Sequence, residues 1–303
     1  MTRIDWVVVI GIGIAGAATG CAGTAAQEHA SSARSSHAQL SLAADERMVV
    51  VPAGHFVTGS TPEERAVAYD DYEATSGKDT ARLEKWFDRE SDRHGGELPA
   101  FRIDLMPVTQ AQFAELVAAE RVAPPSIDEA GAQSQGLGLD LSRVSRFAWK
   151  DGRPPSGRED HPVVLVSWDD AERYCAWRGG LRGEKRRLPT AAEFEKAARG
   201  ADGLAYPWGN AFEPDKLNSA IGGPRDTTPV GSYAAGASTY GVLDMAGNVL
   251  QWTATPAGGD EMIVKGSAWD SVGGLGRGAA QDKRPRAARD VLVGFRCAAD
   301  APP

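Results

Sequence analysis

Three short helix-start signals, separated by long segments rich in glycine and proline, constrain the fold of this chain more than any other feature. Thr109, Ser167 and Thr190 are each followed three residues later by Gln, Asp or Glu, which is the spacing of a capping box. Strands and helices do not alternate regularly along the chain, so the pattern excludes a doubly wound parallel sheet. The predicted helices cover residues 108–120, 169–180 and 188–200.

Short runs of β-branched and aromatic residues predict strands between these helices. Residues 122–158 show little periodicity, and we interpret them as a surface excursion. The predicted strands lie within residues 47–60, 99–108, 161–168, 262–269 and 293–299.

Composition narrows the class of protein. Hydrophobic residues make up 42% of the chain and charged residues 24%, which is typical of a globular domain. Residues 47–300 are enough for one large domain, or two small ones, with a sizeable core. The net charge of −8 argues against nucleic acid as a main partner.

The N-terminal stretch WVVVIGIGIAGAATGC allows two interpretations. Gly11, Gly13 and Gly16 have the G-x-G-x-x-G spacing of a dinucleotide-binding turn. That turn works only inside a βαβ unit, and the polar, serine-rich residues 21–46 contain no second apolar strand. We therefore expect no NAD.

An export signal fits the same stretch better. Arg3 precedes an apolar run over 6–18 that is too short to span a bilayer. Ala18 to Cys21 resembles a bacterial lipobox, in which the cysteine carries lipid, although leucine is usual at the place of Ala18. This predicts a lipoprotein-type signal peptide at 1–20, a disordered tether at 21–46, and anchoring through Cys21. Plain cleavage near Ala17 or Ala26 is the alternative.

A series of short motifs extends over the whole of residues 48–298. The motifs are, in order, MVVVPAGHFVTGS, PVTQAQFAEL, HPVVLVSWDDAERYCAW, RLPTAAEFEKAARG, YPWGN, TTPVGSY, YGVLDMAGNVLQW, KGSAWDS and VGFRC. In this order they resemble the formylglycine-generating enzyme (sulfatase-modifying factor) family. The resemblance implies a single α+β domain of C-type-lectin-like type, poor in regular structure and usually exported.

The resemblance also indicates what has been lost. Members that oxidise cysteine to formylglycine hold Cu(I) with two cysteines five positions apart, and thiolates suit that soft ion. The matching positions here are Gly273 and Gly278, which have no side-chain ligand. We therefore expect no copper and no catalytic residues of this kind.

No other catalytic constellation takes the place of the copper site. His55, His94 and His161 are isolated in the sequence, without the spacing of a metal site. There is no G-x-S-x-G elbow and no P-loop.

An ion site is implied at the stretch DMAGNVLQW, since relatives bind calcium there. The matching ligands are the side chains of Asp244 and Gln251 and the carbonyls of Gly247 and Val249. Oxygen ligands suit this hard cation. Because Gln251 replaces a glutamate, we expect weaker binding. The alternative is a turn held by Asn248 without an ion.

Two cysteines remain if Cys21 carries lipid. An oxidising compartment permits Cys175 and Cys297 to pair, and two buried free thiols are the alternative. The resemblance favours the disulfide, because relatives have a bridge at both matching positions.

The sequence thus leaves three hypotheses on function. The first is a non-catalytic family member, anchored in the cell envelope on the periplasmic side or outer surface, that binds an envelope protein or ligand. The second is an oxidoreductase of the same family with non-standard metal ligands. The third is a structural lipoprotein without a ligand.

Overall fold

The computed structural model describes residues 47–120, 122–128 and 144–302. The predicted signal peptide, tether and lipidated Cys21 lie outside the described residues. Within them, no helix combines the length and apolar character needed to cross a membrane.

The three predicted helices are present, and each begins where its capping box predicts. Thr190 accepts a hydrogen bond from the Glu193 amide while the Glu193 carboxylate accepts one from the Thr190 amide. The same reciprocal pair forms at the other two starts. These helices are α4 (Gln110–Glu120), α7 (Trp168–Gly180) and α8 (Ala191–Arg199).

A further helix, which the sequence analysis missed, starts with the same signal. Thr61 and Glu64 form a capping box, and Pro62 occupies the first turn, where its missing N–H costs nothing. This helix, α2, opens an excursion between two strands that also contains two short helical turns. The elements are α2 (Pro62–Ser76), α3 (Thr80–Leu83) and η1 (Phe87–Arg89).

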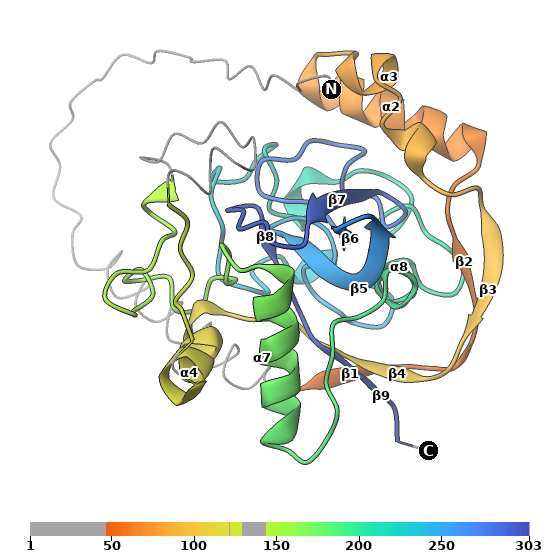
Figure 1. Cartoon of the computed structure of the whole chain (residues 1–303). Helices are drawn as coiled ribbons and strands as arrows, with labels where there is room; N and C mark the ends of the chain where they lie inside the picture. Colours follow the sequence, from red (N-terminus) through yellow and green to blue (C-terminus); the bar gives the residue numbers. More distant parts are fainter. Residues whose placement is uncertain (1–46, 121, 129–143, 303) are drawn as a thin grey trace, which may run out of the picture. The chain divides into compact units, whose positions relative to one another are not determined.

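Three small sheets carry the described strands, with the orders β1-β4-β9, β2-β3 and β7-β6-β5-β8. All pairs are antiparallel except β5 with β8. In Figure 1 the β5–β8 group lies between α7 and the excursion that carries α2. The strands are β1 (Met48–Val51), β2 (Gly54–Thr58), β3 (His94–Leu98), β4 (Phe101–Asp104), β5 (Leu250–Gly258), β6 (Glu261–Lys265), β7 (Gln281–Pro285), β8 (Val293–Gly294) and β9 (Ala298–Asp300).

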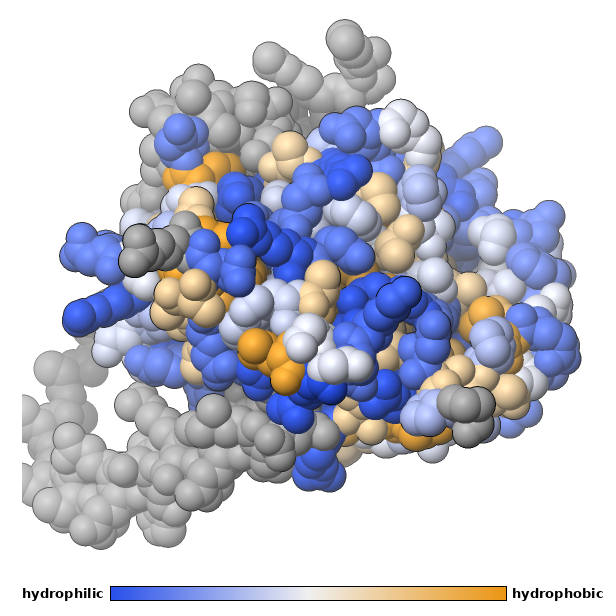
Figure 2. All heavy atoms as spheres, turned by 60° about the horizontal axis from the view of Figure 1, so that its bottom comes forward, coloured by the Kyte–Doolittle hydropathy of each residue, from blue (hydrophilic) through white to orange (hydrophobic). Residues whose placement is uncertain are grey.

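Much of the described chain is irregular, including the turns η2 (Pro214–Lys216) and η3 (Ala234–Gly236). Short helices, small sheets and long loops together confirm the predicted α+β, C-type-lectin-like fold class. On the face seen in Figure 2, hydrophobic residues form small groups among hydrophilic ones.

Buried side chains of α7 and α8 form the core. Phe194, Ala197 and Ala198 of α8 pack against β1 and β4. Tyr174 and Cys175 of α7 lie in a second cluster with Phe295 and Cys297, which belong to the segment between β8 and β9. The core therefore joins the two halves of the sequence.

Two predictions about residues 122–168 were wrong. Residues 161–168 form no strand: Leu165 has φ +60°, and Pro162 makes only an isolated bridge with Thr109. The run is apolar because it is buried. Its amides donate hydrogen bonds to carbonyls of several different segments, so no β-ladder forms. The predicted surface excursion enters the core at Phe147 and Trp149, which are buried, and returns to the surface at residues 150–153.

Candidate functional site

The positions that match copper ligands lie in the irregular loop 272–278. These positions are Gly273 and Gly278, and both residues are buried. A Cβ atom at Gly273 would lie 2.8 Å from the backbone oxygen of Asp71 in α2, and one at Gly278 would overlap Cγ of Arg199 in α8. Neither position has room for a thiolate without movement of its neighbours, so these residues do not fit a copper ion.

Beneath Gly278 lies a buried group of charges. Glu195 accepts from Arg199 Nη1 at 2.7 Å and from Lys265 Nζ at 2.8 Å. Burial alone would raise the pKa of Glu195, but Lys265 and Arg199 outweigh it and leave that pKa lowered. Glu195 is therefore an anion here. Its carboxylate is neutralised by Arg199 and Lys265, so it is not available to a metal ion.

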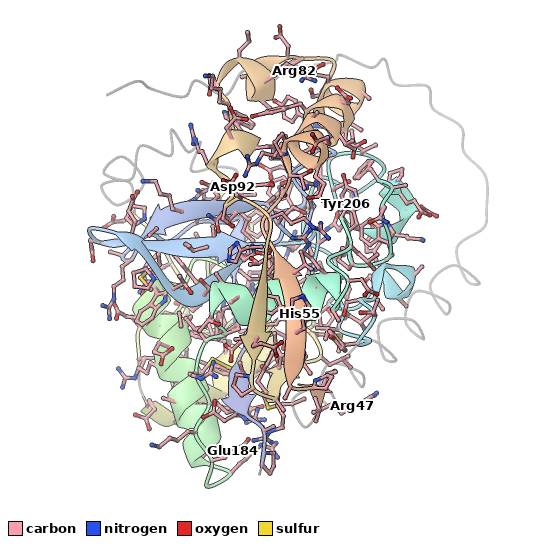
Figure 3. The ribbon with its side chains drawn as sticks, turned by 90° about the vertical axis from the view of Figure 1, so that its right-hand side faces the viewer. Arg47, His55, Arg82, Asp92, Glu184 and Tyr206 are labelled. Carbon is pink, nitrogen blue, oxygen red and sulfur yellow. A yellow bond between two sulfur atoms is a disulfide. The ribbon has the colours of Figure 1, made fainter. Side chains whose placement is uncertain are left out.

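The three isolated histidines do not come together. His161 Nδ1 lies 2.9 Å from Thr227 Oγ1, and burial, aided by Arg158, lowers the pKa of His161 to about 4. His55 and His94 lie on the β2–β3 ribbon; Figure 3 labels His55 there. Among the described residues, no group of three or more His, Cys, Asp or Glu side chains could hold a metal ion.

Two of the predicted calcium ligands, Asp244 and Gln251, lie beside the buried guanidinium of Arg296. Gln251 Nε2 donates to the Asp244 carbonyl at 2.8 Å, and Arg296 Nε donates to Gln251 Oε1 at 2.6 Å. Arg296 also donates to carbonyls of residues 104, 105, 243 and 244. Burial lowers the pKa of Arg296 to about 10, which leaves it charged at neutral pH.

The carboxylate of Asp244 is the one anionic oxygen that the predicted ligand set offers. It is buried, which raises its pKa, and its Oδ2 accepts from the Gly231 amide at 2.8 Å. The Gln251 oxygen is already used by Arg296, and the Gly247 carbonyl accepts from the Val249 amide. One carboxylate beside a buried guanidinium is a poor ligand set for a cation, and calcium at this loop stays a prediction.

Asn248 makes the contacts that a turn without an ion would need. Its Oδ1 accepts from the Thr228 amide at 3.0 Å, and its Nδ2 donates to the Thr228 carbonyl at 3.1 Å. Asn248 has φ +67°, a left-handed conformation that asparagine tolerates better than most residues.

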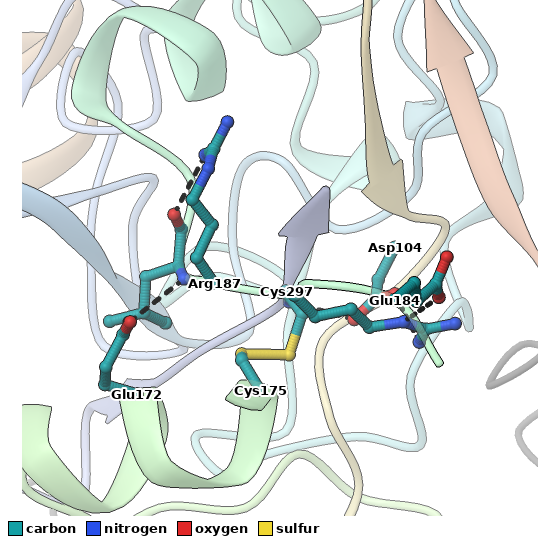
Figure 4. The surroundings of a disulfide bond; sticks show 8 residues. Asp104, Glu172, Cys175, Glu184, Arg187 and Cys297 are labelled. Atoms are coloured by element: carbon teal, nitrogen blue, oxygen red, sulfur yellow. Dashed lines mark hydrogen bonds and ion pairs between the residues drawn. A yellow bond between two sulfur atoms is a disulfide. The ribbon is translucent and has the colours of Figure 1, made fainter. Parts of the chain in front are cut away.

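The predicted disulfide between Cys175 and Cys297 is present, with the Cα atoms 5.5 Å apart (Figure 4). The Cys297 amide donates to Asp104 Oδ2 at 2.8 Å. Burial raises the pKa of Asp104 to about 6, although Arg186 and Arg296 act against the rise. The bridge thus joins helix α7 to the segment between β8 and β9, which also carries Arg296.

A cluster of arginine and aromatic side chains was missed by the sequence analysis. Phe147 and Trp269 stack with their ring centroids 6.2 Å apart. Arg146 Cζ lies 4.8 Å from the Phe147 centroid and 5.5 Å from that of Trp269, and Arg158 lies over Phe147 at 5.0 Å. Asp226 pairs with both arginines. The sequence offers no spacing signal, because tertiary packing joins three distant segments.

The comparisons with known proteins agree with this geometry. The sequence model of the sulfatase-modifying factor enzyme 1-like domain matches residues 34–301. The inactive C-alpha-formylglycine-generating enzyme 2 of Mus musculus is 32% identical over 311 aligned positions, covering 87% of this chain and 89% of that protein. The formylglycine-generating enzyme of Streptomyces coelicolor is 32% identical over 267 positions, covering 71% of this chain and 82% of that protein.

Among solved structures, PvdO from Pseudomonas aeruginosa has the same fold, with a TM-score of 0.63 at 22% identity. The match covers 84% of this chain and 94% of that one. One of these relatives is named inactive and another is named for its activity. Similarity therefore identifies the family, and whether this chain is active has to be argued from its site residues. The chain belongs to the formylglycine-generating enzyme family.

Proposed function

We propose that this protein is a non-catalytic member of the family that works as a binding or accessory module. The observation that carries the proposal is the filled loop 272–278, where Gly273 and Gly278 supply no ligand and neighbouring atoms take the space of a side chain. The relatives named inactive, from Mus musculus and Bos taurus, support it.

The test is direct. The full chain is incubated with Cu(I), oxygen and a sulfatase-type cysteine peptide, while oxygen uptake and peptide mass are followed. We expect no copper-dependent uptake and no aldehyde product. Turnover by the purified chain would overturn the proposal and favour the alternative, an oxidoreductase of this family with metal ligands elsewhere; the 32% identity to the Streptomyces coelicolor enzyme motivates that rival.

For the binding face we propose the exposed Arg146 with the partly buried Arg158 and Trp269, which lie around the buried ring of Phe147. Arginine and aromatic side chains are enriched where proteins bind partners. The Arg146 side chain is 42% exposed, so part of the cluster is open to a ligand.

The partner is expected to be an envelope protein or ligand, and a pull-down from envelope fractions would find it. The bait begins at residue 47, and a Trp269→Ala bait serves as the comparison. A matched control is Trp208→Ala, a partly exposed tryptophan that stacks on Tyr206. Equal capture by the Trp269→Ala bait would rule out this face.

We further propose that the chain is exported and anchored through Cys21. The support is the apolar run that ends at Ala-Thr-Gly-Cys, together with a disulfide of the kind that oxidising compartments permit. Several acyl chains on one terminus would attach it firmly. Cells expressing the chain are labelled with a fatty-acid analogue. Label that is lost in Cys21→Ser is expected, and an unlabelled protein in the cytoplasmic fraction would contradict the proposal.

A further inference from the structure

An excursion of the chain, residues 61–93, covers loop 272–278; we name these residues the cap. The cap contains α2, α3 and η1, and its two ends meet. Ser60 N donates to the Ser91 carbonyl at 3.0 Å, and Arg93 N donates to the Ser60 carbonyl at 3.1 Å. Figure 3 shows the cap above the β2–β3 ribbon, with Asp92 where the two join.

Apolar contacts seat the cap on the loop. Tyr69, Tyr72 and Phe87 form a buried cluster with other cap residues, and Val272 and Leu275 of the loop pack against it. A Cβ atom at Gly274 would overlap the Ala68 carbonyl of α2, so the two backbones touch. Only glycine permits this approach, since Gly274 also has φ +81°.

Hydrogen bonds then fix the loop amides. Gly273 N donates to Thr75 Oγ1 of α2 at 2.9 Å. Gly274 N donates to the Tyr206 hydroxyl at 3.1 Å, and that hydroxyl donates to Asp71 Oδ2 of α2 at 2.7 Å. Two successive loop amides are therefore held, one directly and one through Tyr206, by the same helix.

A buried ion pair closes the contact. Arg277 Nη1 lies 3.2 Å from both carboxylate oxygens of Glu90, and its Nη2 donates to Ser60 Oγ at 2.9 Å. The side chains of Glu90 and Arg277 are 3% and 2% exposed. Removing one member of such a pair leaves an uncompensated buried charge, so the pair acts as a lock between cap and loop.

We propose that the cap permanently covers loop 272–278. It holds the loop in position where relatives have a metal ion, and it prevents other ligands from binding to the loop. The inference rests on the proposed function for one point, that no metal joins positions 273 and 278. It implies that partners reach the protein elsewhere unless the cap is released.

The first test measures hydrogen exchange at loop amides in the full chain. Thr75→Val keeps the shape of the side chain and removes the acceptor of the Gly273 amide. We expect exchange at Gly273 to rise about fivefold, since one hydrogen bond contributes about 1 kcal/mol. Thr80→Val is the matched control, a threonine of the cap that is also half-buried, and should leave that rate unchanged.

Glu90→Gln tests the lock and should speed exchange across residues 273–277 at least tenfold. If Glu90→Gln does not fold, Thr75→Val decides alone. Loop exchange equal to the parent in Thr75→Val would overturn the proposal.

The second test adds the missing cysteines. A Gly273→Cys/Gly278→Cys variant of the full chain is titrated with Cu(I) against a competing chelator. We expect no copper binding above that of the parent, because the cap and Arg199 fill both positions. One tightly bound Cu(I) per chain, with cap exchange unchanged, would overturn the inference. Peptide oxidation by the parent chain would instead overturn the proposed function, so the two failures are distinguishable.

Discussion

The cluster around Arg296 and the capped loop 272–278 are two parts of the same family fold that lack a full set of metal ligands, and the chain stabilises them differently. Around Arg296 the polar groups are hydrogen-bonded to one another. The guanidinium of Arg296 donates to one side-chain amide oxygen and to four backbone carbonyls. At the capped loop, other parts of the chain fill the space of the side chains. The hydrogen bonds around Arg296 still allow an ion to bind weakly nearby. At the capped loop the neighbouring atoms leave no volume for an ion.

The largest effect is expected from the disulfide, which supports the Arg296 side of this comparison. Cys175→Ser/Cys297→Ser opens a bridge between residues 122 apart and should cost about 4–5 kcal/mol in the chain-entropy description. Urea unfolding of the exported chain measures it. The Cys21→Ser chain is the control and should unfold like the parent. Two alkylatable thiols in the unreduced parent would contradict the pairing.

Arg296→Met should cost about 3–4 kcal/mol, because it leaves several buried acceptors without a donor. Arg102→Met is the matched control: Arg102 pairs with Glu184 near the surface and is 24% exposed, so its loss should cost less than about 1 kcal/mol. Denaturant unfolding of both variants gives the comparison. Equal costs would mean that the Arg296 cluster does not hold its loop together.

Asp104, beside Arg296, should make stability depend on pH. Its folded pKa of about 6 lies above the unfolded value of about 3.9, so the stabilising protonated form is lost as pH rises through 6. Between pH 4 and pH 7 the parent should lose about 2–3 kcal/mol relative to Asp104→Asn. The exposed Asp215→Asn serves as the control and should follow the parent. A parent and Asp104→Asn with the same pH slope would contradict this.

Gly278→Ala probes the capped loop with a single methyl group. The new Cβ would overlap Arg199, and overpacking of this kind should cost about 2 kcal/mol. Gly180→Ala, in α7, is the control because a Cβ there meets nothing within 4 Å, and it should be neutral or stabilising. Thermal unfolding separates the two. A tolerated Gly278→Ala would show that the loop has room after all.

The smallest effect is expected from calcium. The parent should gain no more than about 1 kcal/mol from calcium near its dissociation constant, and Gln251→Glu should bind more tightly through its added anionic oxygen. Calorimetry, and thermal unfolding with and without chelator, measure both. Asp244→Ala should abolish the shift. If no variant responds to calcium and Asp244→Ala unfolds like the parent, the ion site is discarded.

Local signals predicted the helices well, because a capping box is complete within four residues. Thr190 with Glu193 located α8, and Thr61 with Glu64 would have located α2 by the same rule. The prediction of a strand at 161–168 was wrong, because a run of apolar residues indicates that a segment is buried and does not indicate its backbone conformation. The resemblance supplied the disulfide, which is present, and the calcium ligands, which stay a prediction. The contact between the cap and residues 273–277 joins segments about two hundred residues apart, and no local pattern encodes it.

The backbone bonds of Ser60, which join the two ends of the cap, have a consequence for the connection between β2 and β3. Topologically, the cap is the connecting loop of the β2–β3 hairpin, whose register ends at Thr58 opposite His94. The entropy of closing a loop grows only slowly with its length, so residues can be gained or lost there at little cost to the hairpin. Strand register does not shift when the connection changes, because backbone bonds at its base fix both ends. The length of the cap, and with it the cover over loop 272–278, can therefore change while the register of β2 and β3 stays the same.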